Sequence, residues 1–381
     1  MVVTKQQKFD SIDIMRGIAI LLVILVHTSQ RIEGNMFLRS FAQYGQMGVQ
    51  MFFIASAFTL CYSFESRQSS EKSLRNFYLR RYFRIAPGYY FGIILYYLVT
   101  SIFTVVWVSD KNLINILANA LFLNGLYQPA NNNVVPGGWS IGTEMLFYLI
   151  FPFIFSSYIK LQNRYKFTYL VIPFFALFLS LIIQFIFYSL TKNPGLFINN
   201  GFIYFSILNQ FPVFCVGISL YFAYKKGLLN NIKFGTCLIM IIFFSCLASY
   251  LMRQNTFTLV HAVTPFIAAL SFVFIFVLLQ NFAKGKGKLL AKIGVVSYSC
   301  YLSHFIFTFY FVSYMAKKLN FIYPDIILIV LYLFTVLLTY YSAGLMYKYI
   351  ELNGVKLGKN IITSRSQHSQ ITISNNQSGK R

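Results

Sequence analysis

The stretch "MRGIAILLVILVHTSQ", residues 15–30, is an apolar run that carries two ionisable side chains. Arg16 stands at its start and His27 near its end, eleven residues apart. An α-helix has 3.6 residues per turn and rises 1.5 Å per residue, so eleven residues make about three turns and about 16 Å. Both side chains therefore project from one helix face at two heights. We interpret the pair as a polar seam along a membrane span that lines a passage.

The composition predicts an all-α, polytopic membrane bundle. Hydrophobic residues make up 57% of the 381 residues and charged residues only 11%, whereas a soluble domain has about 25% charged residues. We expect about ten transmembrane helices of about 18–25 residues. Their approximate centres are Leu21, Phe53, Ile94, Tyr148, Phe178, Val213, Ile242, Leu270, Ser303 and Thr335.

The basic residues predict the orientation of these spans. If the N-terminus is cytoplasmic and the spans alternate, 25 of the 32 Lys and Arg residues fall on the cytoplasmic side. Cytoplasmic loops of membrane proteins collect Lys and Arg, so we expect both termini in the cytoplasm. The formal charge of +23 then follows from topology. We therefore expect the lipid bilayer as a partner, and no nucleic acid.

The chain divides into a membrane-embedded domain, residues 1–360, and a polar tail, residues 361–381, which we expect to be disordered and cytoplasmic. Within the outer loop, residues 108–138, the segment "LINILANALFLNGL" is too short to span. We expect it to lie at the interface or to re-enter the membrane. The five cysteines form no CxxC pair, and the His and carboxylate residues show no ligand spacing, so we expect no metal.

Polar residues within the spans are the candidates for function. Glu144 lies inside the fourth span, and ionisable residues at such depth are costly and usually face a cavity or a partner. Ser297, Tyr301 and His304 share a helix face at spacings of four and three; they form either interhelical hydrogen bonds or part of a site. Arg80, Arg81 and Arg84 are either topological residues or a phosphate-binding cluster.

Six motifs in order resemble those of the acyltransferase family 3 membrane proteins, which O-acylate bacterial surface glycans. Arg16 and His27 are similar to its Arg-x10-His motif, and "GVQMFFIASAF" to its second-span motif, with Ala57 where glycine is usual. "RRYFRIAP" resembles its Arg-x-x-Arg motif, and "WSIGTEMLFY" its Trp-Ser-x-x-x-Glu motif. "SYSCYLSH" and "YIELNGVKLGK" resemble its late motifs, the last departing at Asn353.

The resemblance implies a multi-pass enzyme of the bacterial inner membrane. Its donor would be acyl-CoA, usually acetyl-CoA, used as a co-substrate with no bound cofactor. Its acceptor would be a hydroxyl of a cell-surface or lipid-linked glycan. The alternative is a secondary transporter or exporter of a glycan or lipid-linked intermediate, since polar seams in helical bundles also serve transport. The repeat symmetry that is typical of transporters is absent from this sequence.

If the chain is such an acyltransferase, the candidate residues have the following expected roles. His27 acts as general base, or in a second version of the mechanism as an acyl carrier. Glu144 lies beside His27 in one polar cavity. Arg16 holds a CoA phosphate or stabilises the path of the acyl group electrostatically. Arg81 and Arg84 bind the CoA phosphates. The remaining expected substrate-binding residues are Trp139, Ser140, Tyr301 and His304.

Overall fold

A computed structural model of the chain describes residues 9–67, 74–102, 112–165, 167–191, 202–253, 259–283 and 285–364. Every regular element in these ranges is a helix. The α-helices are α1 (Asp10–Ser29), α2 (Arg39–Tyr44), α3 (Gly48–Glu65), α4 (Leu74–Ile102), α5 (Leu113–Ala120), α6 (Gly138–Arg164), α7 (Thr168–Thr191), α9 (Phe202–Phe205), α10 (Ile207–Lys225), α11 (Phe234–Met252), α12 (Leu259–Phe282), α13 (Lys288–Val295), α14 (Ser297–Ile306), α15 (Ser313–Lys318) and α16 (Pro324–Met346).

Short helices of other types complete the fold. Three 3-10 turns are η1 (Gly45–Met47), η2 (Leu123–Gly125) and η3 (Gln128–Ala130), and two π-helical segments are η4 (Phe307–Val312) and η5 (Tyr347–Glu351). Within the described ranges, nine helices are long and apolar enough to cross a membrane. The number is ten if α13 and the helical run Ser297–Lys318, which meet at 73°, form one bent span. The predicted polytopic helical bundle is therefore confirmed.

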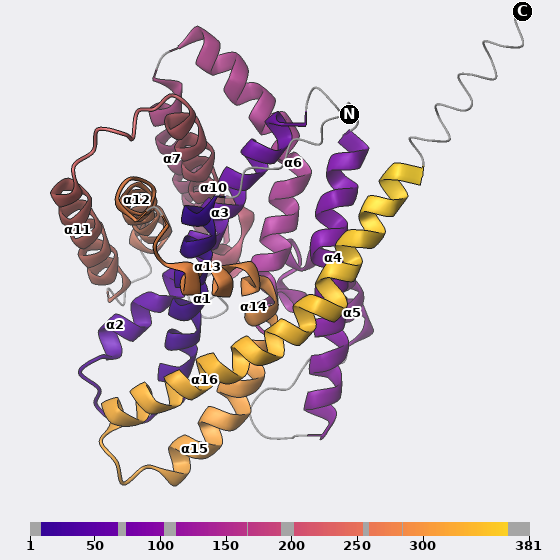
Figure 1. The fold of residues 1–381 in the computed structure, drawn as a ribbon, viewed down its shortest axis with the longest axis vertical. Helices are drawn as coiled ribbons and strands as arrows, with labels where there is room; N and C mark the ends of the chain where they lie inside the picture. Colours follow the sequence, from indigo (N-terminus) through magenta and orange to yellow (C-terminus); the bar gives the residue numbers. More distant parts are fainter. Residues whose placement is uncertain are drawn as a thin grey trace, which may run out of the picture.

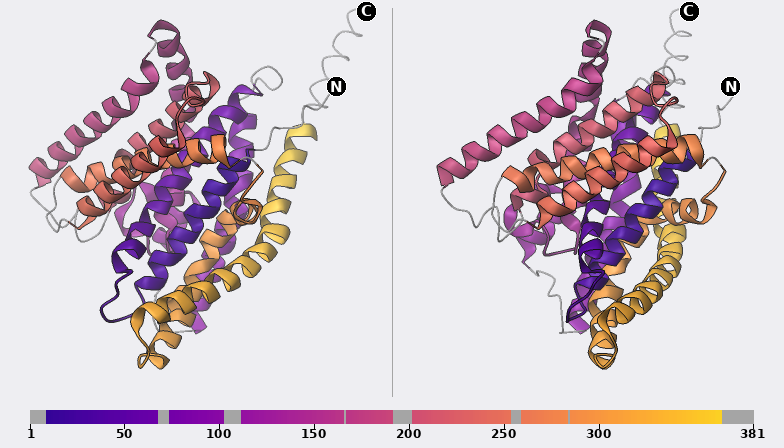
Figure 2. Two further views of the ribbon diagram at one scale, coloured as in Figure 1. Left: turned by 60° about the vertical axis from the view of Figure 1, so that its left-hand side comes forward. Right: turned by 90° about the vertical axis from the view of Figure 1, so that its left-hand side faces the viewer.

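The centre of the bundle is formed by α1, α3 and α10. In the most apolar window of each of these spans, 61–78% of residues are buried, against 22% in α7 and 11% in α11. Figure 1 shows α1 and α3 between a flank that contains α11 and α12 and a flank that contains α4 and α5. Figure 2 shows α16 along one edge of the molecule. The apolar outer faces of the peripheral helices suit contact with lipid tails.

Both ends of the described chain lie on one side of the bundle. Phe9, just before α1, packs edge-on against Tyr62 at the end of α3 and Tyr224 at the end of α10. At the other end of the chain, Gly358 lies against Phe83 near the start of α4. We call this the α1-start side. The last helix continues to Ser364, four residues into the predicted tail; the rest of that tail lies outside the described residues.

A close backbone contact holds α13 across α1. A Cβ atom added at Gly294 would lie 1.8 Å from the carbonyl oxygen of Asp13, and one added at Gly17 would lie 2.2 Å from that of Leu290. Only glycine permits backbones to approach this closely. The contact fixes α13 at the angle from which α14 bends away into the bundle.

The loop before α6 is folded against the bundle by asparagine side chains. The eight-residue α5 is capped by Asn112, which accepts a hydrogen bond from the backbone N–H of Ile114. The Tyr89 hydroxyl donates to Asn119 Oδ1 at 2.6 Å, and Asn124 Nδ2 donates to the carbonyl of Gly138 at 2.9 Å. The loop therefore fixes the first turn of α6, from which two candidate site residues project.

Candidate functional site

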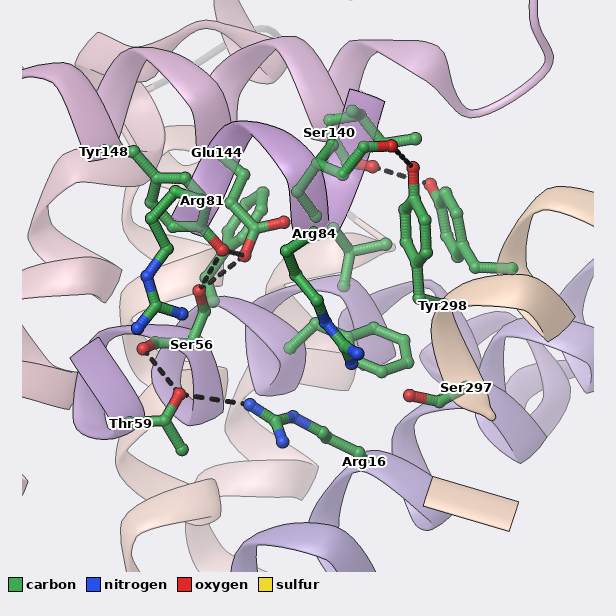
Figure 3. A pocket seen from close by; sticks show the side chains of 16 residues that line it. Arg16, Ser56, Thr59, Arg81, Arg84, Ser140, Glu144, Tyr148, Ser297 and Tyr298 are labelled. Carbon is green, nitrogen blue, oxygen red and sulfur yellow. Dashed lines mark hydrogen bonds between the residues drawn. The ribbon is translucent and has the colours of Figure 1, made fainter. Parts of the chain in front are cut away.

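Five helices surround a polar cavity, shown in Figure 3, that contains three arginines and a glutamate. We call it the arginine cavity. Its lining residues come from α1, α3, α4, α6 and α14: Arg16, Val49, Phe52, Phe53, Ser56, Thr59, Arg81, Arg84, Ile85, Ser140, Ile141, Glu144, Tyr148, Ser297, Tyr298 and Tyr301. Six of the nine residues that received expected roles from the sequence thus lie together: Arg16, Arg81, Arg84, Ser140, Glu144 and Tyr301. Ser297, another sequence candidate, lines the same cavity.

The arginines differ in how their charge is compensated. Arg16 donates to Thr59 Oγ1 at 3.1 Å, and its nearest carboxylate oxygen, on Asp13, is 3.6 Å away. Arg81 donates to Ser63 Oγ at 2.5 Å and forms no ion pair with a described residue. Its enclosed Nε atom has no hydrogen-bond partner among those residues. Arg81 is therefore the arginine with the most unused capacity to bind an anion.

Arg84 is neutralised by a carboxylate that the sequence analysis did not single out. Its Nη1 atom lies 2.5 Å from Glu351 Oε1, and Ser299 donates to Glu351 Oε2 at 3.0 Å. Glu351 is 1% exposed and ends the π-helical segment η5. Its burial could not be predicted from the sequence, because it follows several polar residues at the expected end of a span. A π-helical turn also shifts side chains off the α-helical faces.

Glu144 is held within the arginine cavity by two hydroxyl groups. Ser56 and Tyr148 both donate to its Oε1 atom, at 2.5 and 2.6 Å. The two hydroxyl oxygens are themselves 3.1 Å apart, and Figure 3 shows the three groups as one cluster. Both donors keep the carboxylate oriented toward the arginines. Neither Ser56 nor Tyr148 was a sequence candidate, although both lie within the motifs that were recognised.

A second cavity lies beyond the first, toward the end of α1. We call it the histidine cavity. It is lined by Val23, Val26, His27, Gln30, Arg31, Gln46, Val49, Gln50, Asn132, Pro136, Gly137, Trp139, Tyr204, Phe205, Tyr301, Phe305 and Phe309. Amide and aromatic side chains predominate. This combination suits a sugar, whose hydroxyl groups pair with amides while its apolar faces pack on rings.

His27 is oriented by its neighbours at the edge of this cavity. Its Nδ1 atom is 3.0 Å from Gln30 Oε1. An amide oxygen only accepts, so Nδ1 carries the proton and Nε2 keeps its lone pair. The ring packs on Phe305, with centroids 4.5 Å apart, and lies 5.4 Å from the ring of His304. His27 therefore presents an unprotonated nitrogen without an acidic partner.

The structure does not bring Glu144 and His27 into one cavity, and that expectation is wrong. The two cavities share Val49 and Tyr301 in their linings. Ser140 Oγ donates to the Tyr301 hydroxyl at 2.9 Å, and that hydroxyl donates to the Gly137 carbonyl at 3.1 Å. These bonds hold the Tyr301 side chain at the boundary, which we call the tyrosine partition.

Two further sequence candidates, Trp139 and His304, lie outside the arginine cavity. Trp139 lines the histidine cavity and stacks on Phe205 at 4.3 Å between centroids. Its neighbour Ser140 faces the arginine cavity, so successive residues of α6 serve different cavities. His304 is fully buried, pairs through Nδ1 with the Tyr301 carbonyl at 2.7 Å and lines neither cavity.

Arg31 adds a cation to the histidine cavity. Its guanidinium carbon lies 4.3 Å from the centroid of the Phe309 ring. Burial lowers the pKa of Arg31 below its ordinary value, but arginine remains protonated in proteins. In the part of the chain that the structure describes, no group of three or more His, Cys, Asp or Glu side chains could hold a metal ion.

The helical membrane bundle thus contains a cationic cavity that adjoins a cavity lined by a histidine, amides and aromatic rings. The chain belongs to acyltransferase family 3, because the family model described as an acyltransferase domain matches residues 9–348. No curated protein matches the chain, and no solved structure does. The family makes this protein a membrane acyltransferase.

Proposed function

We propose that this acyltransferase moves an acyl group, usually acetyl, from acyl-CoA to a hydroxyl group of a cell-surface or lipid-linked glycan. The observation that carries the proposal is the contact between the arginine cavity and the histidine cavity at the tyrosine partition. One cavity offers cations for phosphate, and the other offers a histidine with amides and rings. Separate sites for donor and acceptor suit a transfer between them.

The arrangement of charge favours acyl-CoA in the arginine cavity. If the spans alternate as predicted from the sequence, most basic residues of the chain fall on the side where α1 begins, which by the positive-inside rule is the cytoplasmic side. Acyl-CoA is a cytoplasmic molecule with three phosphate groups. Arg81, with no carboxylate partner among the described residues, is the primary phosphate ligand, and Arg16 lies deeper along the same cavity. Arg84 contributes less because Glu351 neutralises it.

The chemical step takes place at the tyrosine partition. The acceptor hydroxyl attacks the thioester carbonyl carbon, and His27 Nε2 removes the hydroxyl proton. The C–S bond then breaks, and the proton returns from His27 to the CoA sulfur, which leaves as a thiol. The thioester must reach past Tyr301, so its hydrogen bonds to Ser140 and Gly137 have to break or rearrange during the reaction.

The proposal is tested by following acetyl transfer. Purified protein in lipid vesicles receives acetyl-CoA labelled in the acetyl group, with membranes of a strain that lacks the gene as the source of acceptor. We expect the wild type to label glycan and His27→Ala to do so about 10²–10⁴-fold more slowly, the usual cost of losing a general base. The matched control is Arg253→Gln, an exposed arginine that lines neither cavity. Near-normal transfer by a folded His27→Ala variant would remove His27 from the reaction.

A further inference from the structure

Arg31 places a positive charge in the histidine cavity, and no negative charge of this cavity balances it. No aspartate or glutamate is among the residues that line the cavity. The Arg31 guanidinium forms no hydrogen bond or ion pair with any residue that the structure describes, and its Nε atom is enclosed without a partner. An enclosed polar group without a partner destabilises the folded protein, and a charged group does so more than a neutral one.

The ring of Phe309 does not satisfy this group. The guanidinium lies 4.3 Å from the ring centroid, which provides a cation–π attraction to one face of the plane. The N–H donors of a guanidinium lie in its plane and point outward from its edge. The edge of Arg31 therefore remains available for two parallel hydrogen bonds, the geometry in which arginine binds a carboxylate or a phosphate.

The position of Arg31 sets where such an anion would lie. Arg31 follows His27 by four residues, and the helical hydrogen bonding of α1 extends past its end through Gln30, whose N–H donates to the Val26 carbonyl. One helical turn separates the two side chains, a rise of about 6 Å. A group bound by Arg31 is thus within the width of one sugar ring of the hydroxyl that His27 deprotonates.

We propose that the acceptor is an acidic glycan, in which a carboxylate or phosphate on the acylated sugar or its neighbour binds the guanidinium of Arg31. The inference rests on the proposed function and specifies its acceptor. The amides of Gln46, Gln50 and Asn132 lie around the same cavity and would receive the sugar hydroxyls. Gln50 has an enclosed Oε1 atom without a hydrogen-bond partner among the described residues.

The experiment compares one glycan in charged and neutral forms. Surface glycan from a strain that lacks the gene is purified, and half is converted chemically, by reduction of carboxylates to alcohols or by phosphatase treatment. Both forms are offered, with labelled acetyl-CoA, to wild type, Arg31→Gln, Arg31→Lys and the control Arg253→Gln. We expect wild type and the control to prefer the charged form by about 10- to 100-fold in kcat/KM, the range of a hydrogen bond to a charged group.

The Arg31 variants give the decisive result. Arg31→Gln should lose this preference because its kcat/KM for the charged form falls toward its kcat/KM for the neutral form, and Arg31→Lys should keep part of the preference. The inference is wrong if the natural acceptor carries no anionic group, if wild type treats both forms alike, or if Arg31→Gln discriminates like wild type. His27→Ala separates the two claims: an active His27→Ala variant contradicts the proposed function, whereas an inactive one leaves the Arg31 result to decide the inference.

Discussion

At the scale of single residues, the proposed mechanism requires one histidine, His27, to act as a base without a carboxylate beside it. Gln30 Oε1 lies 3.0 Å from Nδ1 and thereby selects the tautomer in which Nε2 is free. Catalytic histidines often use an aspartate for this purpose, which also stabilises the imidazolium. A neutral amide fixes the tautomer but places no negative charge beside the ring.

Gln30 therefore has a testable role as a positioning residue. Gln30→Met removes the acceptor, and we expect kcat to fall about three- to tenfold, the value of one neutral hydrogen bond, while KM for acetyl-CoA stays constant. Gln30→Glu keeps the acceptor and adds a negative charge that stabilises the protonated ring. The base form of His27 then predominates only at higher pH, so the acidic limb of the pH–rate profile should move upward. An unchanged profile in Gln30→Glu would show that this contact does not act on His27.

Substitution of Glu144 should affect the reaction differently from substitution of Gln30, because Glu144 lines the arginine cavity. Glu144→Gln keeps an oxygen that can accept from Ser56 and Tyr148 but removes the charge that faces the arginines. We expect a lower rate of acetyl-CoA turnover, with the acidic limb of the pH–rate profile unmoved, since Glu144 makes no contact with His27. Steady-state rates at a series of pH values measure both quantities. A shift of the acidic limb of the pH–rate profile in Glu144→Gln would instead support a direct pairing of Glu144 with His27.

At the scale of helices, the crossing of α1 and α13 depends on glycine. A methyl group at Gly294 would meet the Asp13 carbonyl at 1.8 Å, whereas one at Gly344 in α16 would meet nothing within 4 Å. We therefore expect Gly294→Ala to lower the melting temperature of the detergent-solubilised protein by several degrees. Gly344→Ala should leave it unchanged or raise it, because alanine favours a helix by about 1 kcal/mol over glycine. Equal melting temperatures would contradict the close crossing.

The sequence predicted helices well and their lateral contacts poorly. Apolar runs indicated the spans, and the motifs indicated Arg16, Arg81, Arg84 and Glu144, which meet in one cavity. Depth along each span also placed Glu144 and His27 toward the same side. Depth does not say which neighbours a side chain meets around the helix axis, and the hydrogen bonds of Tyr301 that divide the cavities join residues 161 and 164 positions apart.

The sequence also did not indicate which residues just beyond a span belong to the site. Gln30 and Arg31 follow the last residue of α1, where polar side chains are ordinary and carry no signal of their own. Glu351 was hidden for a similar reason, since its pairing with Arg84 depends on a π-helical segment that side-chain periodicity does not predict. Each of these residues is recognised only by the group that it touches.

At the scale of the whole molecule, the proposed function assigns the donor to the arginine cavity and the acceptor to the histidine cavity. Arg81→Gln should raise KM for acetyl-CoA about tenfold with little change in kcat, because phosphate contacts are remote from the reacting carbon and act as uniform binding. Arg75→Gln is the matched control, an exposed arginine on the same helix. An unchanged KM in Arg81→Gln would make Arg81 a topological residue only.

The central claim is that the acyl group enters from the α1-start side and is delivered beyond the tyrosine partition. The most direct measurement adds labelled acetyl-CoA to sealed membrane vesicles that contain the protein and its glycan. We predict that inside-out vesicles, which expose the cytoplasmic face, label glycan in their lumen, that right-side-out vesicles do so only after permeabilisation, and that His27→Ala abolishes both signals. Equal labelling of intact right-side-out vesicles, or labelling that survives His27→Ala, would contradict the account.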